Sequence, residues 1–291
     1  MDGPGPQASS RPGYAAVHGR PRSAPIEAAG VLGSRLAAPL LGSPAVFPTV
    51  LRLGMGRLRS GRASAAVPVG AALAYFGPGL LLRIWPEQVA FRLPDTIRDA
   101  GGPRWTGSAF LDAGDWRDAL APVEHCRVYV EMQELVAADL DWRATPSYRR
   151  AKKAAQQGRP VYRSGRPLAD PEALKAYFRR CADLIRSLRS HGLLDRRAQA
   201  ALAFDRPSHR GARPAAKEWA ERDVGVAINA DGGLVRHLGG RHRWAAVRAL
   251  GLPLAPVEIR LVHLAWLERA AAETGLPPSR ALPAALARLG G

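Results

Sequence analysis

Residues 224–263 read VGVAINADGGLVRHLGGRHRWAAVRALGLPLAPVEIRLVH. Apolar residues alternate with small or polar ones from Val224 to Asn229, and this period of two predicts a strand with one apolar face. Asp231-Gly232-Gly233 is typical of a tight turn, so residues 234–238 are expected to return as the second strand of a hairpin.

A helix and a third strand follow within the same stretch. Trp244, Val247 and Leu250 recur at helical spacing, which predicts a helix over 241–250 that Gly251 ends. Residues 256–263 alternate between apolar and charged side chains and predict the third strand. The expected fold class is therefore α+β, with a mixed sheet and helices packed on it.

The sequence Gly239-Gly240 stands directly before the helix that starts with Arg241, His242 and Arg243. Glycine lets the backbone approach an anion without a Cβ collision, and the free amides and dipole of a helix start favour negative charge. Arg241 and Arg243 add planar donors suited to phosphate oxygens, and His242 can donate to phosphate or move a proton. The alternative is a helix start whose arginines pair with nearby carboxylates.

Two further helices are expected upstream. Residues 171–191 carry apolar side chains three and four apart, and Gly192 is a stop signal. Residues 123–138 also alternate with a helical period. The polar, arginine-rich stretch 195–222 favours a loop or a short helix.

In this order the motifs resemble those of the ParB/sulfiredoxin-like superfamily. Residues 184–194, LIRSLRSHGLL, are similar to the helix with which ParB-type domains begin, and residues 240–246 match the family pattern G-x-x-R-x-x-A. The resemblance continues through LGLP at 250–253 and covers about 173–263. An upstream acidic, tryptophan-containing region, at Asp112–Trp116 and Asp141–Trp142, and the end VHLAW at 262–266 resemble bacterial and archaeal ParB-like proteins of no established activity. With these motifs the resemblance extends over about 108–266.

The resemblance implies that the turn at 239–243 holds nucleotide phosphates. Members of the superfamily include CTP-dependent DNA clamps, ATP-using sulfiredoxins and an ADP-dependent kinase of free serine. Sulfiredoxins carry a nucleophilic cysteine where this chain has Arg241, so thiol chemistry is not expected. Fewer than 30 residues follow Val262, which disfavours the helix-turn-helix domain of a partitioning clamp.

The expected function is nucleotide binding, with ATP or another NTP held together with Mg²⁺. Phosphotransfer to a small hydroxyl compound is the enzymatic hypothesis, in which an acid deprotonates the acceptor or binds Mg²⁺. The candidate acids are Asp223 and Glu218 beside the first strand and Glu258 on the third, and His242 is the candidate for proton transfer. A non-catalytic nucleotide sensor and a nucleic-acid-binding or nuclease-like protein are the alternatives. His237 and His263 flank the same sheet and are expected to be structural.

Charge is unevenly distributed along the chain. The formal net charge is +17, but only four of the 42 basic residues are lysine, a bias that a GC-rich coding sequence produces without selection for binding. Residues 143–217 hold 19 basic residues against five acidic ones, whereas 111–141 hold eight acidic residues against two basic ones. The basic middle can attract nucleic acid, nucleotide or lipid headgroups, or it can pack against the acidic segment. Nucleic acid is a partner that the sequence permits but does not favour.

The chain is expected to have five parts and to act in the cytoplasm, since no secretory signal is evident. Residues 63–82 lack charge but are broken by proline and glycine, which favours a buried helix or hairpin and leaves a peripheral membrane contact as the alternative. Cys126 and Cys181 show no metal-ligand spacing, so neither a metal site nor a disulfide framework is expected. The parts are a poorly ordered segment at 1–62, an apolar segment packing on the core at 63–107, a helical tryptophan-bearing region at 108–170, the ParB/sulfiredoxin-like domain at 171–266, and a C-terminal helix or tail at 267–291.

Overall fold

The computed structural model describes four parts of the chain and one isolated residue. Predictions that fall on the segments between them, including Glu218 and most of the loop at 195–222, lie outside the described residues. The described residues are 37–99, 102–163, 166–195, 198 and 223–290.

The fold is α+β, as expected, and is built on one mixed sheet. Its strands follow the order β1–β6–β12–β10–β11–β3–β7, and β2 pairs with the first half of β12. Two small ribbons, β4–β5 and β8–β9, stand apart from it. The strands are β1 (Ala65–Pro68), β2 (Leu81–Ile84), β3 (Phe91–Arg92), β4 (Thr96–Asp99), β5 (Gly102–Trp105), β6 (Ala109–Asp112), β7 (Ala121–Pro122), β8 (Tyr162–Arg163), β9 (Arg166–Pro167), β10 (Val224–Ile228), β11 (Leu234–Arg236) and β12 (Ala255–His263).

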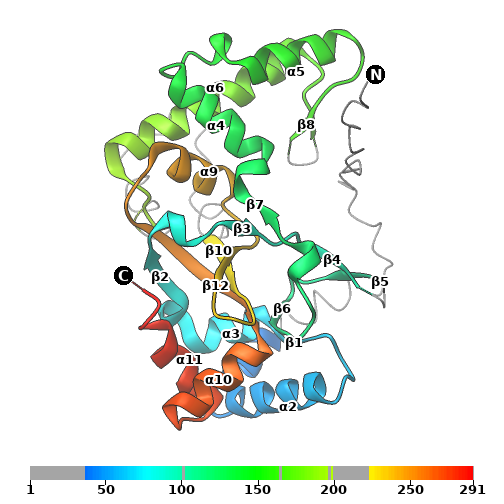
Figure 1. The fold of residues 1–291 in the computed structure, drawn as a ribbon, viewed down its shortest axis with the longest axis vertical. Helices are drawn as coiled ribbons and strands as arrows, with labels where there is room; N and C mark the ends of the chain where they lie inside the picture. Colours follow the sequence, from blue (N-terminus) through cyan, green and yellow to red (C-terminus); the bar gives the residue numbers. More distant parts are fainter. Residues whose placement is uncertain (1–36, 100–101, 164–165, 196–197, 199–222, 291) are drawn as a thin grey trace, which may run out of the picture.

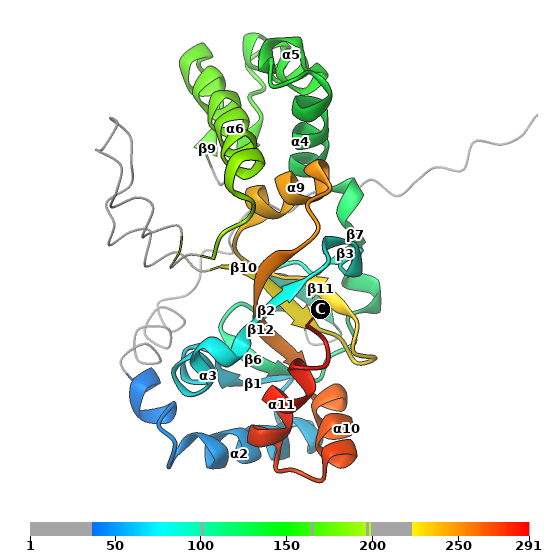
Figure 2. The ribbon, with the colours of Figure 1, turned by 90° about the vertical axis from the view of Figure 1, so that its left-hand side faces the viewer.

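Helices cover the sheet at both ends of the molecule. In Figures 1 and 2, α4, α5 and α6 form a lobe at one end, α9 lies between this lobe and the sheet, and α2, α10 and α11 gather at the other end. The helices are α2 (Phe47–Arg59), α3 (Val69–Phe76), α4 (Arg127–Ala137), α5 (Pro146–Gln156), α6 (Pro171–His191), α9 (Arg241–Leu250), α10 (Leu264–Thr274) and α11 (Pro278–Leu286), with short 3₁₀ turns η1 (Gly77–Leu80), η2 (Pro86–Gln88), η3 (Arg117–Ala119), η4 (Val123–His125) and η5 (Trp142–Ala144).

The helix α6 has the bounds that the sequence predicts. Asp170 caps it by accepting a hydrogen bond from the Ala173 amide at 2.8 Å, and Pro171 occupies the first turn, where its missing N–H costs nothing. Gly192 ends the helix with a φ of 67°, which glycine adopts without strain. The apolar stripe of α6 is buried against α4, α5 and α9. The predictions for α9 at 241–250 and for α4 within 123–138 are also confirmed.

The strands β10 and β12 are buried on both faces, so the prediction of a single apolar face is wrong. Their register shifts after Val226, where β12 carries one extra residue, Arg260, between Ile259 and Leu261. This bulge turns Ile259 and Leu261 to opposite sides of the sheet. Leu261 joins a small cluster under β3, β4 and η3, whereas Ile259 belongs to the main core.

The segment 1–62 was expected to be poorly ordered, and for α2 this is wrong. Phe47, Leu51 and Met55 are at most 2% exposed, and α2 packs against β1 and α11. Each buried side chain of this size stabilises the fold by roughly 1.5–3 kcal/mol. Two of the glycines that suggested disorder stand at close contacts: a Cβ on Gly42 would lie 2.5 Å from Ala74 Cβ, and one on Gly54 would lie 2.6 Å from Val67 Cγ2.

The expected division into 63–107, 108–170 and 171–266 does not match the sheet. Strands β1, β2, β3, β6 and β7 come from 65–122 and are hydrogen-bonded into the same sheet as β10–β12. The expected helical region before the sheet is therefore wrong, because five strands of the sheet itself come from this part of the chain. Residues 63–82 form β1, α3, η1 and the start of β2, and no helix among the described residues is long and apolar enough to cross a membrane.

Two neighbouring leucines of α2 test whether this helix belongs to the core. Leu51→Ala should lower the free energy of unfolding by about 2–4 kcal/mol, because Leu51 is 1% exposed and its loss leaves a cavity. Leu53→Ala, at a position that is 63% exposed, should change it by less than about 0.5 kcal/mol. Urea unfolding of both variants measures the difference, and equal, small effects would contradict the packing of α2.

Candidate functional site

The turn before α9 is three residues of left-handed backbone. Leu238, Gly239 and Gly240 have φ values of 46°, 59° and 55°. Glycine adopts this region freely, but for leucine it costs roughly 1–2 kcal/mol. The helix α9 begins at Arg241, and no side chain in the described part of the chain caps its first amides. The turn therefore presents an uncapped helix start, and Gly239 in it is exposed.

Both glycines are required by the protein itself. A Cβ on Gly240 would lie 2.6 Å from Val224 Cγ2 and 2.9 Å from Val224 Cα. One on Gly239 would lie 2.7 Å from Nη1 of Arg260 and 3.0 Å from the carbonyl oxygen of Asp223. The absent side chains would therefore point into the start of β10. The sequence analysis explained the glycines by the close approach of an anion. The geometry explains them by the packing of the turn on β10.

Arg243 faces inward and lies near Asp223. Arg243 is 6% exposed and Asp223 8%, with Nη1 and Oδ1 3.8 Å apart. Below them, Arg260 donates from Nη2 to the carbonyl oxygen of Asp223 at 2.7 Å and from Nε to Glu258 at 2.8 Å. Arg243 thus follows the alternative interpretation of the helix start, in which an arginine pairs with a nearby carboxylate and not with phosphate. Two of the candidate acids therefore form ion pairs beneath the turn: Asp223 with Arg243, and Glu258 with Arg260.

Three other arginines gather at the turn without an ion pair to a carboxylate in the described residues, although the negative charge of Asp95 acts on one of them, Arg236. Arg236 on β11 stands beside Arg92 on β3 in parallel register, and Arg241 opens α9. Burial, and then the positive charge of Arg241, lower the pKa of Arg236 to about 10. In the part of the chain that the structure describes, no ion pair joins any of the three to an acid. The Nε atoms of Arg92 and Arg236 are buried and have no hydrogen-bond partner among the described residues.

Arg236 also fixes the shape of the turn. Its Nη2 donates to the carbonyl oxygen of Gly239 at 2.6 Å. Arg236 therefore links β11 to the left-handed backbone and holds positive charge beside Arg241. Like charges this close are unfavourable unless an anion lies between them or solvent screens them.

His242 points away from the turn into a buried polar chain. Its Nε2 lies 3.2 Å from the Tyr177 hydroxyl, which donates to Glu131 at 2.7 Å, and Arg163 pairs with Glu131. A hydroxyl has one proton, so Nε2 of His242 must donate to Tyr177. Burial, followed by the nearby charges of Arg241 and Arg163, lowers the pKa of His242 to about 4. The imidazole is neutral at pH 7 and anchors α9 to α6 and α4.

The remaining histidines of the sheet have structural surroundings. His237 is fully buried, and burial lowers its pKa to about 3. His263 caps α10: its Nδ1 accepts from the Ala265 amide and its Nε2 faces the Gly114 carbonyl at 3.2 Å. Trp116 packs edge-on against His263. Two of the outlying motifs of the resemblance, Asp112–Trp116 and 262–266, therefore meet in one place.

Sequence reasoning missed the residues that surround the turn. Arg236 and Arg260 stand in strands, where an arginine is usually assigned to a solvated face. The useful signal was their position within otherwise apolar strands. Tyr177 was assigned to the apolar stripe of α6, and Glu131 was counted only as part of an acidic segment. Nothing in their spacing shows that they meet His242.

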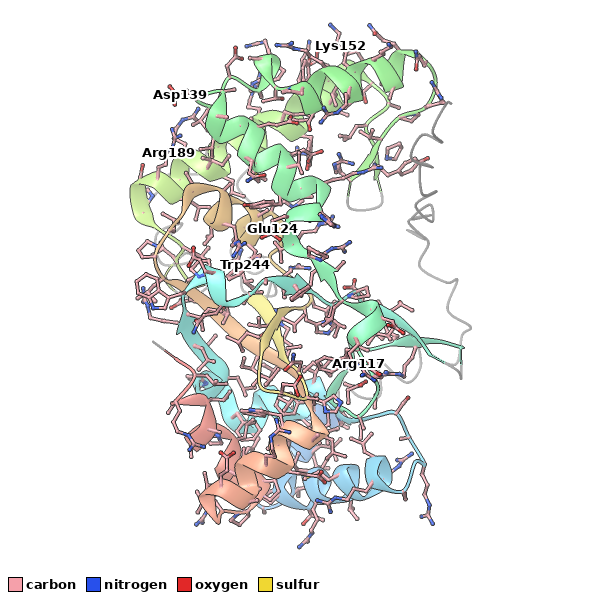
Figure 3. All side chains as sticks on the ribbon, viewed as in Figure 1. Arg117, Glu124, Asp139, Lys152, Arg189 and Trp244 are labelled. Carbon is pink, nitrogen blue, oxygen red and sulfur yellow. The ribbon has the colours of Figure 1, made fainter. Side chains whose placement is uncertain are left out.

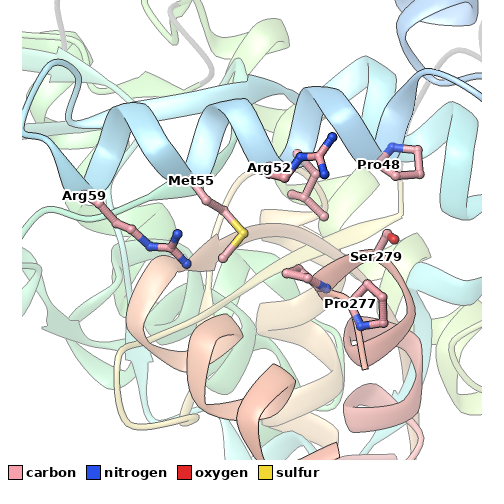
Figure 4. A pocket seen from close by; sticks show the side chains of 8 residues that line it. Pro48, Arg52, Met55, Arg59, Pro277 and Ser279 are labelled. Atoms are coloured by element: carbon pink, nitrogen blue, oxygen red, sulfur yellow. The ribbon is translucent and has the colours of Figure 1, made fainter. Parts of the chain in front are cut away.

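Two cavities of the described chain lie away from the turn. The larger, of about 310 Å³, lies between α2 and α11, with Met55 pointing into it and Pro277 and Ser279 on the opposite wall (Figure 4). The smaller, of about 200 Å³, lies between α10 and α11 beside Asp231. Among the described residues no group of three or more His, Cys, Asp or Glu is placed to hold a metal ion.

A glycine pair tests the packing of the turn. Gly240→Ala should lower the free energy of unfolding by about 2–4 kcal/mol, since it adds a steric collision with Val224 to the strain of a positive φ. Gly251→Ala, with a φ of 62° but open space around it, should cost only about 1 kcal/mol. Thermal or urea unfolding gives both values, and equal costs would show that the turn does not rest on β10.

Acid should destabilise the fold through His242. Its folded pKa of about 4 lies below the ordinary value of 6.5, so the unfolded chain binds a proton in this window that the folded chain does not. Stability therefore falls as the pH drops from 6.5 towards 4, by roughly 1–3 kcal/mol for this residue. His242→Gln keeps a donor to Tyr177 but cannot titrate, so its loss of stability over this range should be smaller. Urea unfolding at each pH gives the free energy of unfolding of both proteins. If this free energy falls in parallel for the two, His242 is not the group responsible.

Comparison of the chain with models of protein families, with curated proteins and with solved structures finds no match in any of the three.

Proposed function

We propose that the turn before α9 binds the phosphate groups of a nucleotide. The observation that carries the proposal is the arginine group Arg92, Arg236 and Arg241, which forms no ion pair with a carboxylate of the described residues and stands at an uncapped helix start. Amides at a helix N-terminus and arginine guanidinium groups are the donors that phosphate oxygens prefer.

Each member of the arginine group has its own part in this proposal. Arg241 is half-buried at the first position of α9 and supplies the charge closest to the free amides. Arg236 holds Gly239 and keeps the turn open, while Arg92 stands beside it on β3. The orphaned Nε atoms of Arg92 and Arg236 are donors that an anion can satisfy. Arg243 and the glycines contribute the support beneath.

The ParB/sulfiredoxin-like assignment belongs to the same proposal. It is supported by the order of elements: α6, the β10–β11 hairpin, the glycine turn, α9 and β12 follow one another as the motifs require. It is the source of the expectation that the anion is a nucleotide, such as ATP or another NTP with Mg²⁺, and not free phosphate. Tighter binding of a nucleotide than of pyrophosphate is the result that this expectation predicts.

The position of Asp223 favours nucleotide sensing over phosphotransfer. A phosphotransferase needs an acid that activates the acceptor hydroxyl or binds Mg²⁺. Asp223 is the described candidate acid nearest to the turn, and it is buried beside Arg243. Turnover would require it to leave this partner. Binding without turnover makes no such demand, so we place sensing first and phosphotransfer to a small hydroxyl compound second.

Isothermal titration with ATP, ADP, CTP, GTP and pyrophosphate, with and without Mg²⁺, tests the proposal. Arg241→Gln and Arg236→Gln should each weaken binding of the preferred nucleotide about 10- to 100-fold, since a hydrogen bond to a charged group contributes about 1.5–3 kcal/mol. Arg57→Gln, which removes an exposed arginine of α2, is the matched control and should bind as the wild type does.

Failure of the wild type to bind any of these anions would remove the proposal, and equal weakening in the Arg57 variant would reduce it to an effect of net charge. Release of phosphate from the bound nucleotide that is lost in Asp223→Asn, while nucleotide binding persists, would restore phosphotransfer to first place.

A further inference from the structure

A second cationic feature lies away from the turn. Residues 142–169 contain no aspartate or glutamate, yet they hold eight basic residues. The middle of this stretch forms α5, which lies at the outer end of the helical lobe, where Lys152 projects from the molecule (Figures 1 and 3). Part of this stretch does pack against the acidic segment, since Arg150 pairs with Glu134 and Arg163 with Glu131. The outer side of α5 stays on the surface.

The two sides of α5 differ in character. Ser147 and Ala151 are buried against the lobe, while Arg149, Lys152 and Lys153 are exposed at the three- and four-residue spacing of one helix face. No ion pair involves these three cations in the described part of the chain, whereas Arg150 beside them pairs with Glu134. We call these three residues the α5 face.

Two flanking arginines extend the α5 face. Arg143, before α5, lies over the Trp142 ring at 4.3 Å, and the exposed Arg159 follows the helix. Arg149 donates to the Ala144 carbonyl at 2.8 Å, which holds its guanidinium at the start of α5. A helix of this length is roughly 16 Å long, which corresponds to about five phosphates along one strand of a duplex.

The lysines show that this surface is more than a bias of composition. The chain has four lysines among 42 basic residues, and Lys152 and Lys153 stand side by side on α5. A bias towards arginine explains an excess of arginine but not lysines concentrated on one exposed helix face.

We propose that the α5 face binds the sugar–phosphate backbone of nucleic acid, independently of its base sequence. Unpaired cations in a row release counterions from a polyanion and bind it without reading bases. A lipid surface fits less well, because a membrane-binding helix combines cations with large exposed apolar side chains. The exposed large apolar residues of the described chain lie elsewhere, apart from Tyr162 on β8.

Fluorescence anisotropy with labelled random-sequence DNA and RNA, single- and double-stranded, tests this proposal over a salt series. The triple variant Arg149→Gln/Lys152→Gln/Lys153→Gln should weaken binding at least about 10-fold and lower the slope of log affinity against log salt by about 2–3. The control Arg52→Gln/Arg57→Gln/Arg83→Gln removes the same charge from exposed positions of α2 and β2 and should keep most of the affinity. Thermal unfolding should show that both variants are as stable as the wild type.

Equal loss in the two triple variants, or no loss in the α5 variant, overturns the proposal. Binding to vesicles containing anionic phospholipid in the absence of nucleic-acid binding overturns it in favour of a membrane. The nucleotide site is separable: Arg241→Gln should leave nucleic-acid binding within about twofold of the wild type, and the α5 variant should bind nucleotide normally. These crossed measurements show which of the two surfaces fails if one does.

Discussion

The bulge at Arg260 is the constraint from which the candidate site is built. β12 must pair with β10, β2 and β6, and the extra residue lets it send Ile259 to one core cluster and Leu261 to the other. The guanidinium of Arg260 then lies under the start of β10, where it holds the Asp223 carbonyl. Because the glycine turn rests on the same atoms, the geometry of the central strand and that of the turn are set together.

Charge around the turn is arranged in two layers. The lower layer, with Arg243, Arg260, Asp223 and Glu258, is buried and internally paired. The upper layer, the arginine group, forms no ion pair with an acid of the described residues, although the charge of Asp95 acts on Arg236. Burying paired charges is tolerable, whereas like charges held together need an outside partner. This difference separates residues that support the turn from residues available to a ligand.

How far the sequence predicts this molecule depends on how local the signals are. The bounds of α6 and α9 are predictable because Asp170, Gly192 and Gly251 mark helix ends through short-range geometry. The two- to four-residue strands of 65–122 carry too few residues to show a period, and their pairing with β10–β12 is a long-range event. The glycine–arginine turn was located correctly, but the inward direction of Arg243 follows from the contacts of β10, which no spacing within 239–243 reveals.

The chain from His242 through Tyr177 to Glu131 has a mechanical consequence. It joins the first turn of α9 to α6 and α4, so the lobe that carries α5 and the left-handed turn are connected through buried polar contacts as well as apolar ones. Hydrogen bonds weaken steeply outside a narrow range of distance and angle, so these polar contacts resist sliding of one helix past another. A displacement of α9 at its first turn would therefore either break this chain or carry α6 and α4 with it.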